Sequence, residues 1–79
     1  MSLKAVVTDT IALFEERGVS KSLLKKEVKM RQRAPVGDDE FADALHDLKR
    51  RELIEERRDP FTDDTLYTIT PRGQEWLDQ

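Results

Sequence analysis

A run of basic residues is the part of this sequence best suited to bind a ligand. Residues 21–33 contain six cations and one acid, for a net charge of +5. The cations are Lys21, Lys25, Lys26, Lys29, Arg31 and Arg33. Lysines repeated every four residues stack on one side of an α-helix. This basic stripe predicts contact with the phosphates of a polyanion. Phosphate contacts position a protein without reading the base sequence. The alternative is a solvated helix face.

An acidic segment follows the basic one. Residues 38–47 contain five acids and no lysine or arginine, for a net charge of −5, and residues 49–58 return to +2. The acids are Asp38, Asp39, Glu40, Asp43 and Asp47. Acids early in a helix complement its dipole. They could also form a docking surface for a basic partner, or pair with the lysine stripe of a second copy.

The composition gives little support for catalysis. The chain has no cysteine and one histidine, which argues against a disulfide framework and a thiolate or His-rich metal site. It also lacks a glycine-rich phosphate loop and a recognisable nucleophile–base pair. We therefore expect no enzyme activity and no cofactor. The length of 79 residues predicts a single domain over residues 1–79. Without a signal-peptide pattern, a cytoplasmic location is expected.

Three amphipathic helices are expected in the first part of the chain. Apolar spacings of three and four predict a helix from Leu3 to Arg17, stopped by Gly18. Ser20 is a suitable cap for a second helix that reaches about Met30, with Leu23, Leu24, Val28 and Met30 on one side. After the break at residues 34–37, Asp38 or Asp39 should cap a third helix that ends near Arg51. Its buried stripe is predicted to be Phe41, Ala44, Leu45 and Leu48.

The last part of the chain predicts a β-hairpin and a short helix. Residues 65–70 are rich in β-branched and aromatic side chains, and residues 53–58 supply an antiparallel partner. Residues 59–64 form the turn, in which Phe61 is expected to fold back onto the sheet. Thr70 should cap a final helix with Pro71 at its first position. Trp76 and Leu77 on this helix are expected to pack against the core.

This order of elements carries a family resemblance. The segment LHDLKRRELIEERRDPFTDDTLYTITPRGQEWL resembles the C-terminal part of MarR- and PadR-type winged-helix domains. The matching positions are Leu45, Leu48, Leu53, Ile54, Tyr67, Ile69, Thr70 and Gly73. The implied fold class is mainly α with a small β-hairpin (α+β): a winged helix-turn-helix with a three-helix core, a two-stranded wing and a short C-terminal helix.

The resemblance implies a small DNA-binding transcriptional regulator. In that class the second helix braces the DNA backbone, the third enters the major groove, and the wing reaches an adjacent groove or phosphate. The implied groove-facing residues of the third helix are Asp39, Glu40, Asp43, His46, Asp47 and Arg50. The wing would contribute Arg57 and Arg58. A homodimer through the first and last helices is a further expectation.

A second interpretation remains open, because the third helix and the wing tip are acidic. Four acids accompany one arginine and one histidine on the expected groove-facing side, and the wing tip reads Asp63-Asp64-Thr65. Closely spaced phosphates would repel such a surface. The alternative is a winged-helix module for protein–protein interaction, which does not bind DNA and docks a partner on the acidic third-helix face.

Overall fold

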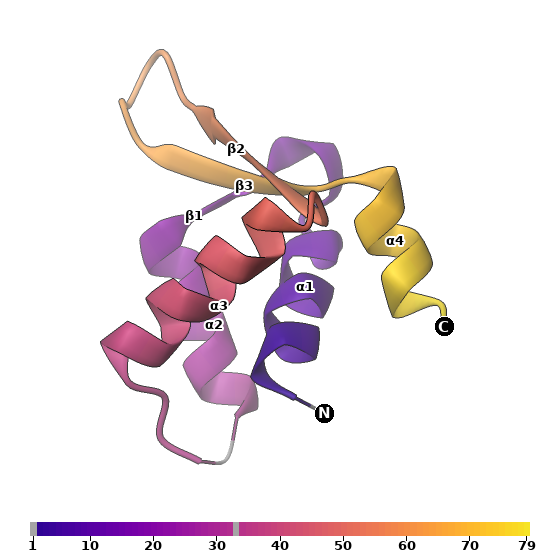
Figure 1. Cartoon of the computed structure of the whole chain (residues 1–79). Coiled ribbons are helices and arrows are strands. Elements are labelled where there is room, and N and C mark those ends of the chain that lie inside the picture. The colour runs from indigo at the N-terminus through magenta and orange to yellow at the C-terminus, as the bar shows by residue number, and fades with distance from the viewer. Residues whose placement is uncertain (1, 33) are drawn as a thin grey trace.

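The computed structural model describes residues 2–32 and 34–79, with Glu16 described by its backbone alone. Three helices, a hairpin and a last helix follow one another as expected (Figure 1). The elements are α1 (Leu3–Leu13), the 3₁₀ helix η1 (Glu15–Arg17), β1 (Val19–Ser20), α2 (Lys21–Arg31), α3 (Asp38–Arg50), β2 (Ile54–Arg58), β3 (Thr65–Ile69) and α4 (Pro71–Leu77). No helix in the described ranges is both long and apolar enough to cross a membrane.

Serine side chains cap the first two α-helices. Ser2 Oγ accepts from the Ala5 N–H at 3.2 Å, and Ser20 Oγ accepts from the Leu23 N–H at 3.3 Å, as predicted for Ser20. The α-helical part of the first helix ends earlier than predicted, at Leu13, and η1 continues to Arg17. Gly18 follows with a φ of 78°, a conformation that suits glycine.

Backbone conformation, and not a side-chain cap, sets the two ends of the third helix. The prediction that Asp38 or Asp39 caps α3 is wrong: Gly37 occupies the cap position and makes no side-chain bond, so Asp38 is the first helical residue. At the other end, the Leu53 N–H donates to the Leu48 carbonyl at 3.0 Å. Glu52 adopts a φ of 61° between them. This left-handed ending stops α3 at Arg50, with Arg51 and Glu52 between the helix and the apolar pair that opens the hairpin.

The hairpin forms the larger part of a three-stranded antiparallel sheet. β3 pairs with β2 from Ile54 opposite Ile69 to Arg58 opposite Thr65. β1, which the sequence analysis missed, pairs with the other edge of β3, with Val19 opposite Tyr67. The strand order is therefore β1-β3-β2, and the hairpin rises beyond the helices as a wing (Figure 1).

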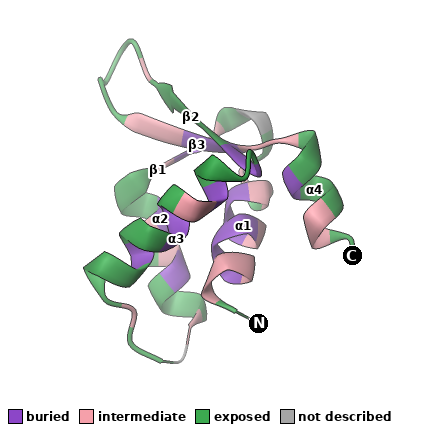
Figure 2. Cartoon of the chain, viewed as in Figure 1, coloured by how far each residue is buried: buried purple, intermediate pink, exposed green. Residues whose placement is uncertain are grey.

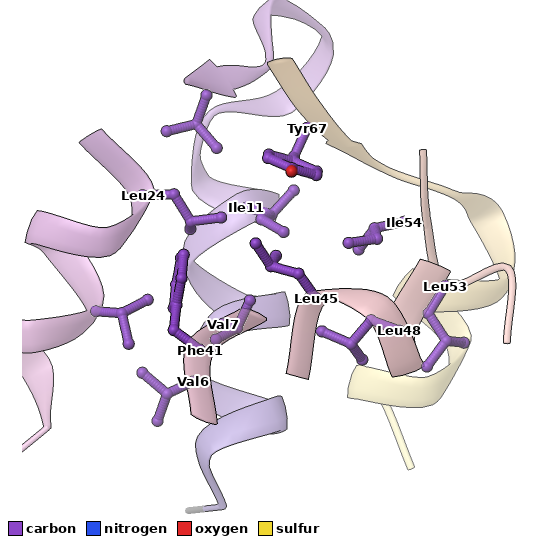
Figure 3. Packing of buried hydrophobic residues seen from close by; sticks show 12 residues of the cluster. Val6, Val7, Ile11, Leu24, Phe41, Leu45, Leu48, Leu53, Ile54 and Tyr67 are labelled. Carbon is purple, nitrogen blue, oxygen red and sulfur yellow. The ribbon is translucent and has the colours of Figure 1, made fainter. Parts of the chain in front are cut away.

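The core lies between the three helices and the base of the sheet. Phe41, Leu45 and Leu48 point from α3 toward α1 and the sheet (Figure 3). All four members of the predicted α3 stripe are buried. On α2 the prediction was half wrong, because Leu24 and Val28 are fully buried whereas Leu23 and Met30 are 38% and 72% exposed.

The last helix is attached to the turn between α3 and β2. Thr70 caps α4 as predicted, since its Oγ1 accepts from the Gly73 N–H at 3.0 Å. The same hydroxyl donates to the Glu52 carbonyl at 2.6 Å. Gly73 faces the Leu53 carbonyl so closely that a Cβ would lie 2.1 Å from its oxygen. Trp76 packs against the core, as expected.

Candidate nucleic-acid interface

Three elements meet on one side of the molecule: α2, α3 and the wing. Lys25 of α2 forms an ion pair with Asp38 of α3. Lys49 of α3 pairs with Glu56 of β2, with 2.7 Å between Nζ and Oε2. The first turns of α2 and the wing tip line one depression, which contains Lys21, Lys25, Asp63, Asp64 and Thr65. These contacts link α2, α3 and the wing, which are neighbours in the fold (Figure 1).

The side chains of the lysine stripe differ in how exposed they are. Lys21, Lys26 and Lys29 are exposed, whereas the Lys25 side chain retains 30% exposure beside Asp38. Arg31 lies apart from the stripe, because its Nη1 contacts Asp9 Oδ2 of α1 at 3.1 Å. Arg33, the last of the predicted phosphate-binding cations, lies outside the described residues.

Two of the acids on and beside α3 are already paired with cations of the same chain. The ammonium group of Lys25 lowers the pKa of Asp38. Asp47 was expected to face outward, and this prediction is wrong. Its side chain is only 13% exposed, and its Oδ2 contacts Lys4 at 3.0 Å and Arg51 at 3.1 Å. The bond from Lys4 is the main reason that the pKa of Asp47 is lowered. The surface is thus less negative than the sequence suggested.

The outward stripe of α3 consists of residues spaced by three and four on the side opposite Phe41 and Leu48. Its members, all exposed, are Asp39, Asp43, His46 and Arg50. Arg50 Nη2 contacts Asp47 Oδ1 at 2.8 Å while its side chain stays 71% exposed. A groove between α3 and the start of α1 is lined by Lys4 and Glu40, and also by Asp43, His46 and Arg50 of the outward stripe.

One cation of this surface was missed by the sequence analysis. Lys49 stands on the flank of α3 that faces β2, and its bond to Glu56 raises the pKa of Lys49. The sequence could have indicated that Glu56 faces α3. Glu56 and the core residue Ile54 are two positions apart on β2 and therefore share one side of the strand. Glu56 lies opposite the buried Tyr67 in the register.

The two wing arginines do not act together. Adjacent residues of a strand point to opposite faces of the sheet. Arg58 is on the α3 side, where its Nε contacts Asp63 Oδ1 at 3.0 Å. Arg57 is on the other face and lines a depression with Ala12 and Glu15. Of the two, only Arg58 therefore lies on the face of the sheet that is turned toward α3.

The described residues contain no cluster suited to a metal ion. Among residues 2–32 and 34–79, no group of three or more histidine, cysteine, aspartate or glutamate side chains is placed to hold one. The surface offers ammonium and guanidinium groups, together with serine, threonine and imidazole side chains that can form hydrogen bonds.

Solved structures of other proteins share this arrangement. The PcaV transcriptional regulator from Streptomyces coelicolor, solved with its natural ligand, aligns with a TM-score of 0.80 and 20% identity over 99% of this chain and 50% of that one. The MarR family transcription regulator SP03579 gives 0.79 and 19% over 99% and 47%. F93 from STIV, described as a winged-helix DNA-binding protein, gives 0.76 and 15% over 94% and 77%. No protein-family model and no curated protein matches the sequence.

The fold defined by these elements is a winged helix-turn-helix. The hairpin is the wing, α2 and α3 are the helix pair, and the resemblance to MarR-type domains is confirmed for the fold. The chain spans about half the length of PcaV and of SP03579, at 50% and 47%. It corresponds to a part of each of those regulators.

Proposed function

We propose that this protein binds double-stranded DNA as a small transcriptional regulator. The observation that carries the proposal is that α2, α3 and the wing are neighbours, joined by the contacts Lys25–Asp38 and Lys49–Glu56 and by a depression shared by α2 and the wing tip. The winged-helix fold supports it, because similar structures include a protein described as DNA-binding and two described as transcription regulators.

Each part of the face would have a distinct role. Lys21, Lys25, Lys26 and Lys29 would contact phosphates and position the duplex, since phosphate contacts fix register without reading sequence. Arg50 and His46 would approach base edges in the major groove, for which Arg50 would exchange Asp47 for a guanine edge. Arg58 would anchor the wing on a phosphate. Arg31, Arg33 and Arg57 stay in the proposal as weaker, peripheral contributors.

Two structural details make the acidic segment compatible with DNA. Asp47 is turned toward Lys4, and Asp38 is paired with Lys25. What remains on the outward stripe is two acids, one arginine and one histidine. This reduces the support for the alternative, a protein-docking module that uses the acidic α3 face.

A binding titration tests the proposal. The affinity for a mixed-sequence duplex, measured by fluorescence anisotropy, should fall as salt rises, because each phosphate contact releases about 0.9 of a counterion. Four lysine contacts predict a loss of roughly a hundredfold between about 50 and 200 mM salt. The variant Lys25→Glu/Lys29→Glu should abolish binding.

The matched control is Arg72→Glu, a charge reversal on α4, where Arg72 is exposed and pairs with Glu52 at 3.3 Å. It should leave duplex binding unchanged. If duplex binding is absent at low salt, or if Lys25→Glu/Lys29→Glu binds like the wild type, the proposal is wrong. In the first case, loss of a protein complex on Asp39→Lys/Asp43→Lys, which reverses two exposed acids of the outward stripe, would favour the docking module.

A palindromic site would require two copies. We propose, as an addition, a homodimer through α1 and α4, for which the exposed Leu13 at the end of α1 offers an apolar contact. Analytical ultracentrifugation of Leu13→Glu in the presence of a palindromic duplex would test it. A two-to-one complex that persists in this variant would contradict the addition and leave DNA binding itself in place.

A further inference from the structure

The wing tip carries an aromatic side chain that makes almost no contact with the rest of the chain. Phe61 is 95% exposed, more than any other large apolar side chain in residues 2–32 and 34–79. The expectation that it folds back onto the sheet is wrong. Figure 2 shows the wing loop as exposed along nearly its whole length. Aromatic side chains bury a large apolar surface and dominate interface energetics, so this position suits an anchor.

The loop holds Phe61 outward through its own hydrogen bonds. The Phe61 N–H donates to Asp59 Oδ1 at 2.9 Å, which lowers the pKa of Asp59. The Asp63 N–H donates to the Asp59 carbonyl at 2.8 Å, and the Asp59 N–H donates to the Asp64 carbonyl at 2.8 Å. A loop that is ordered before binding loses less conformational entropy when its aromatic side chain is buried.

The charge around Phe61 argues against DNA as its partner. Residues 58–64 contain three acids and one cation, for a net charge of −2. Asp63 is paired with Arg58, but Asp59 and Asp64 add negative charge next to the ring. Insertion between base pairs would bring these carboxylates against the phosphates, which would repel them. The tip is better matched to an apolar groove with a basic rim.

A shallow apolar patch with a basic rim, called the α2 groove below, exists on one face of α2 of the same chain. It is lined by Ser22, Lys25, Lys26, Lys29 and Met30. Met30 is 72% exposed, and lysine side chains provide aliphatic stems along the groove with ammonium groups at its rim. An ammonium group can also contact the face of a phenyl ring. With 95% of its surface exposed, Phe61 does not fill the groove of its own chain.

We propose that the wing tip of one copy docks into the α2 groove of a second copy. Phe61 would contact Met30 and the lysine stems, and the three acids of the tip would face Lys25, Lys26 and Lys29. The two surfaces differ, so the contact is heterologous. A contact between one loop and one helix face is small, which predicts weak, salt-sensitive association. The proposal does not depend on DNA binding, although it uses some of the same lysines.

A mixing experiment tests this contact without DNA. Phe61→Ser removes the anchor and leaves the groove, whereas Met30→Glu places an acid in the groove and leaves the tip. Each variant alone should weaken self-association at least about tenfold in sedimentation equilibrium at low salt. An equimolar mixture should recover association, because one variant keeps an intact groove and the other keeps an intact tip. The altered residues are exposed, and circular dichroism melts verify that both variants fold.

The control is Glu55→Gln, a change of an exposed side chain on β2 that lies outside the wing tip and the α2 groove, which should self-associate like the wild type. A wild-type chain that stays monomeric at millimolar concentration would overturn the proposal, as would a mixture that fails to recover association. Association that depends on Leu13 and not on Phe61 would move the contact to α1. Loss of duplex affinity in Phe61→Ser, with a monomeric wild type, would make the tip a DNA contact instead.

Discussion

Lys25 and Asp38 form an ion pair that joins the middle of α2 to the first turn of α3. The pair brings the basic segment and the start of the acidic segment into contact within one chain. It also lies at the edge of the proposed DNA-binding surface. The zoned charges of the sequence are therefore partly neutralised by the fold itself.

The first prediction follows from this pair. Asp38→Asn removes a negative charge from the edge of the surface and releases Lys25, so duplex affinity should rise by about three- to tenfold at low salt. Fluorescence anisotropy with the mixed-sequence duplex measures the change. Asp78→Asn, an aspartate-to-asparagine change just after α4, is the matched control and should bind like the wild type. An unchanged or lower affinity in Asp38→Asn would contradict the assignment of Lys25 to phosphate contact.

The second prediction concerns Gly73. A methyl group there would lie 2.1 Å from the Leu53 oxygen and 2.9 Å from Ile69 Cγ1, so α4 would have to move away from the sheet. Gly73→Ala should lower the free energy of unfolding by roughly 3 kcal/mol or more, as overpacking against backbone does. Urea denaturation measures this loss. In the control Gly37→Ala, the added methyl group meets only the flexible Glu40 side chain at 3.6 Å, and the expected loss is below about 1 kcal/mol.

The third prediction concerns the Thr70 hydroxyl. It accepts from the Gly73 N–H and donates to the Glu52 carbonyl, so it ties the start of α4 to the end of α3. Thr70→Ala should cost about 1–2 kcal/mol of unfolding free energy, in the range of lost helix caps. Thr70→Ser keeps both bonds and should lose much less. Equal losses in the two variants, measured by thermal melts, would show that the methyl group and not the hydroxyl matters.

The fourth prediction is a dependence of stability on pH. Contacts with cations lower the pKa of Asp38 and of Asp47, and backbone bonds lower the pKa of Asp59. A lowered pKa in the folded state stabilises the fold above the ordinary carboxyl pKa, and this stabilisation is lost as pH falls through the lowered value. The melting temperature should therefore fall below about pH 4.

Asp47→Asn is the variant that tests this pH dependence, because Asp47 contacts Lys4, Arg50 and Arg51. Its melting temperature should be lower than that of the wild type at neutral pH and should change less between about pH 5 and 2. Asp39→Asn removes a carboxylate from the outward stripe of α3 and serves as the control. If the wild-type melting temperature does not change on acidification, the ion pairs of Asp47 contribute nothing to stability.

Much of the fold could be predicted because its signals are local. The α3 stripe of Phe41, Ala44, Leu45 and Leu48 repeats with the helical period, and all four residues are buried. Thr70 and Pro71 predicted the start of α4 by cap chemistry. A two-residue strand has too few positions to show a period, so β1 was missed. Likewise, apolar character did not reveal that Met30 and Phe61 are exposed, because exposure depends on which elements lie nearby.

The candidate site was harder to predict, because charge pairing depends on tertiary structure. The sequence predicted that Asp47 faces outward, because the pattern of α3 alone does not show that α1 brings Lys4 beside it. Lys49 was overlooked because its partner Glu56 belongs to the wing. Arg57 and Arg58 are adjacent in sequence, and the alternation of side chains along a strand already separates them to opposite faces of the sheet.

The short strand β1 has a mechanical consequence for the wing. It bonds to β3 along the edge opposite β2, and its second residue, Ser20, also caps α2. Tilting of the hairpin about its base would therefore have to break the β1–β3 bonds or drag the start of α2 with it. The wing and the basic helix are therefore linked through β1, and we expect a displacement of the wing to change the position of the lysines of α2.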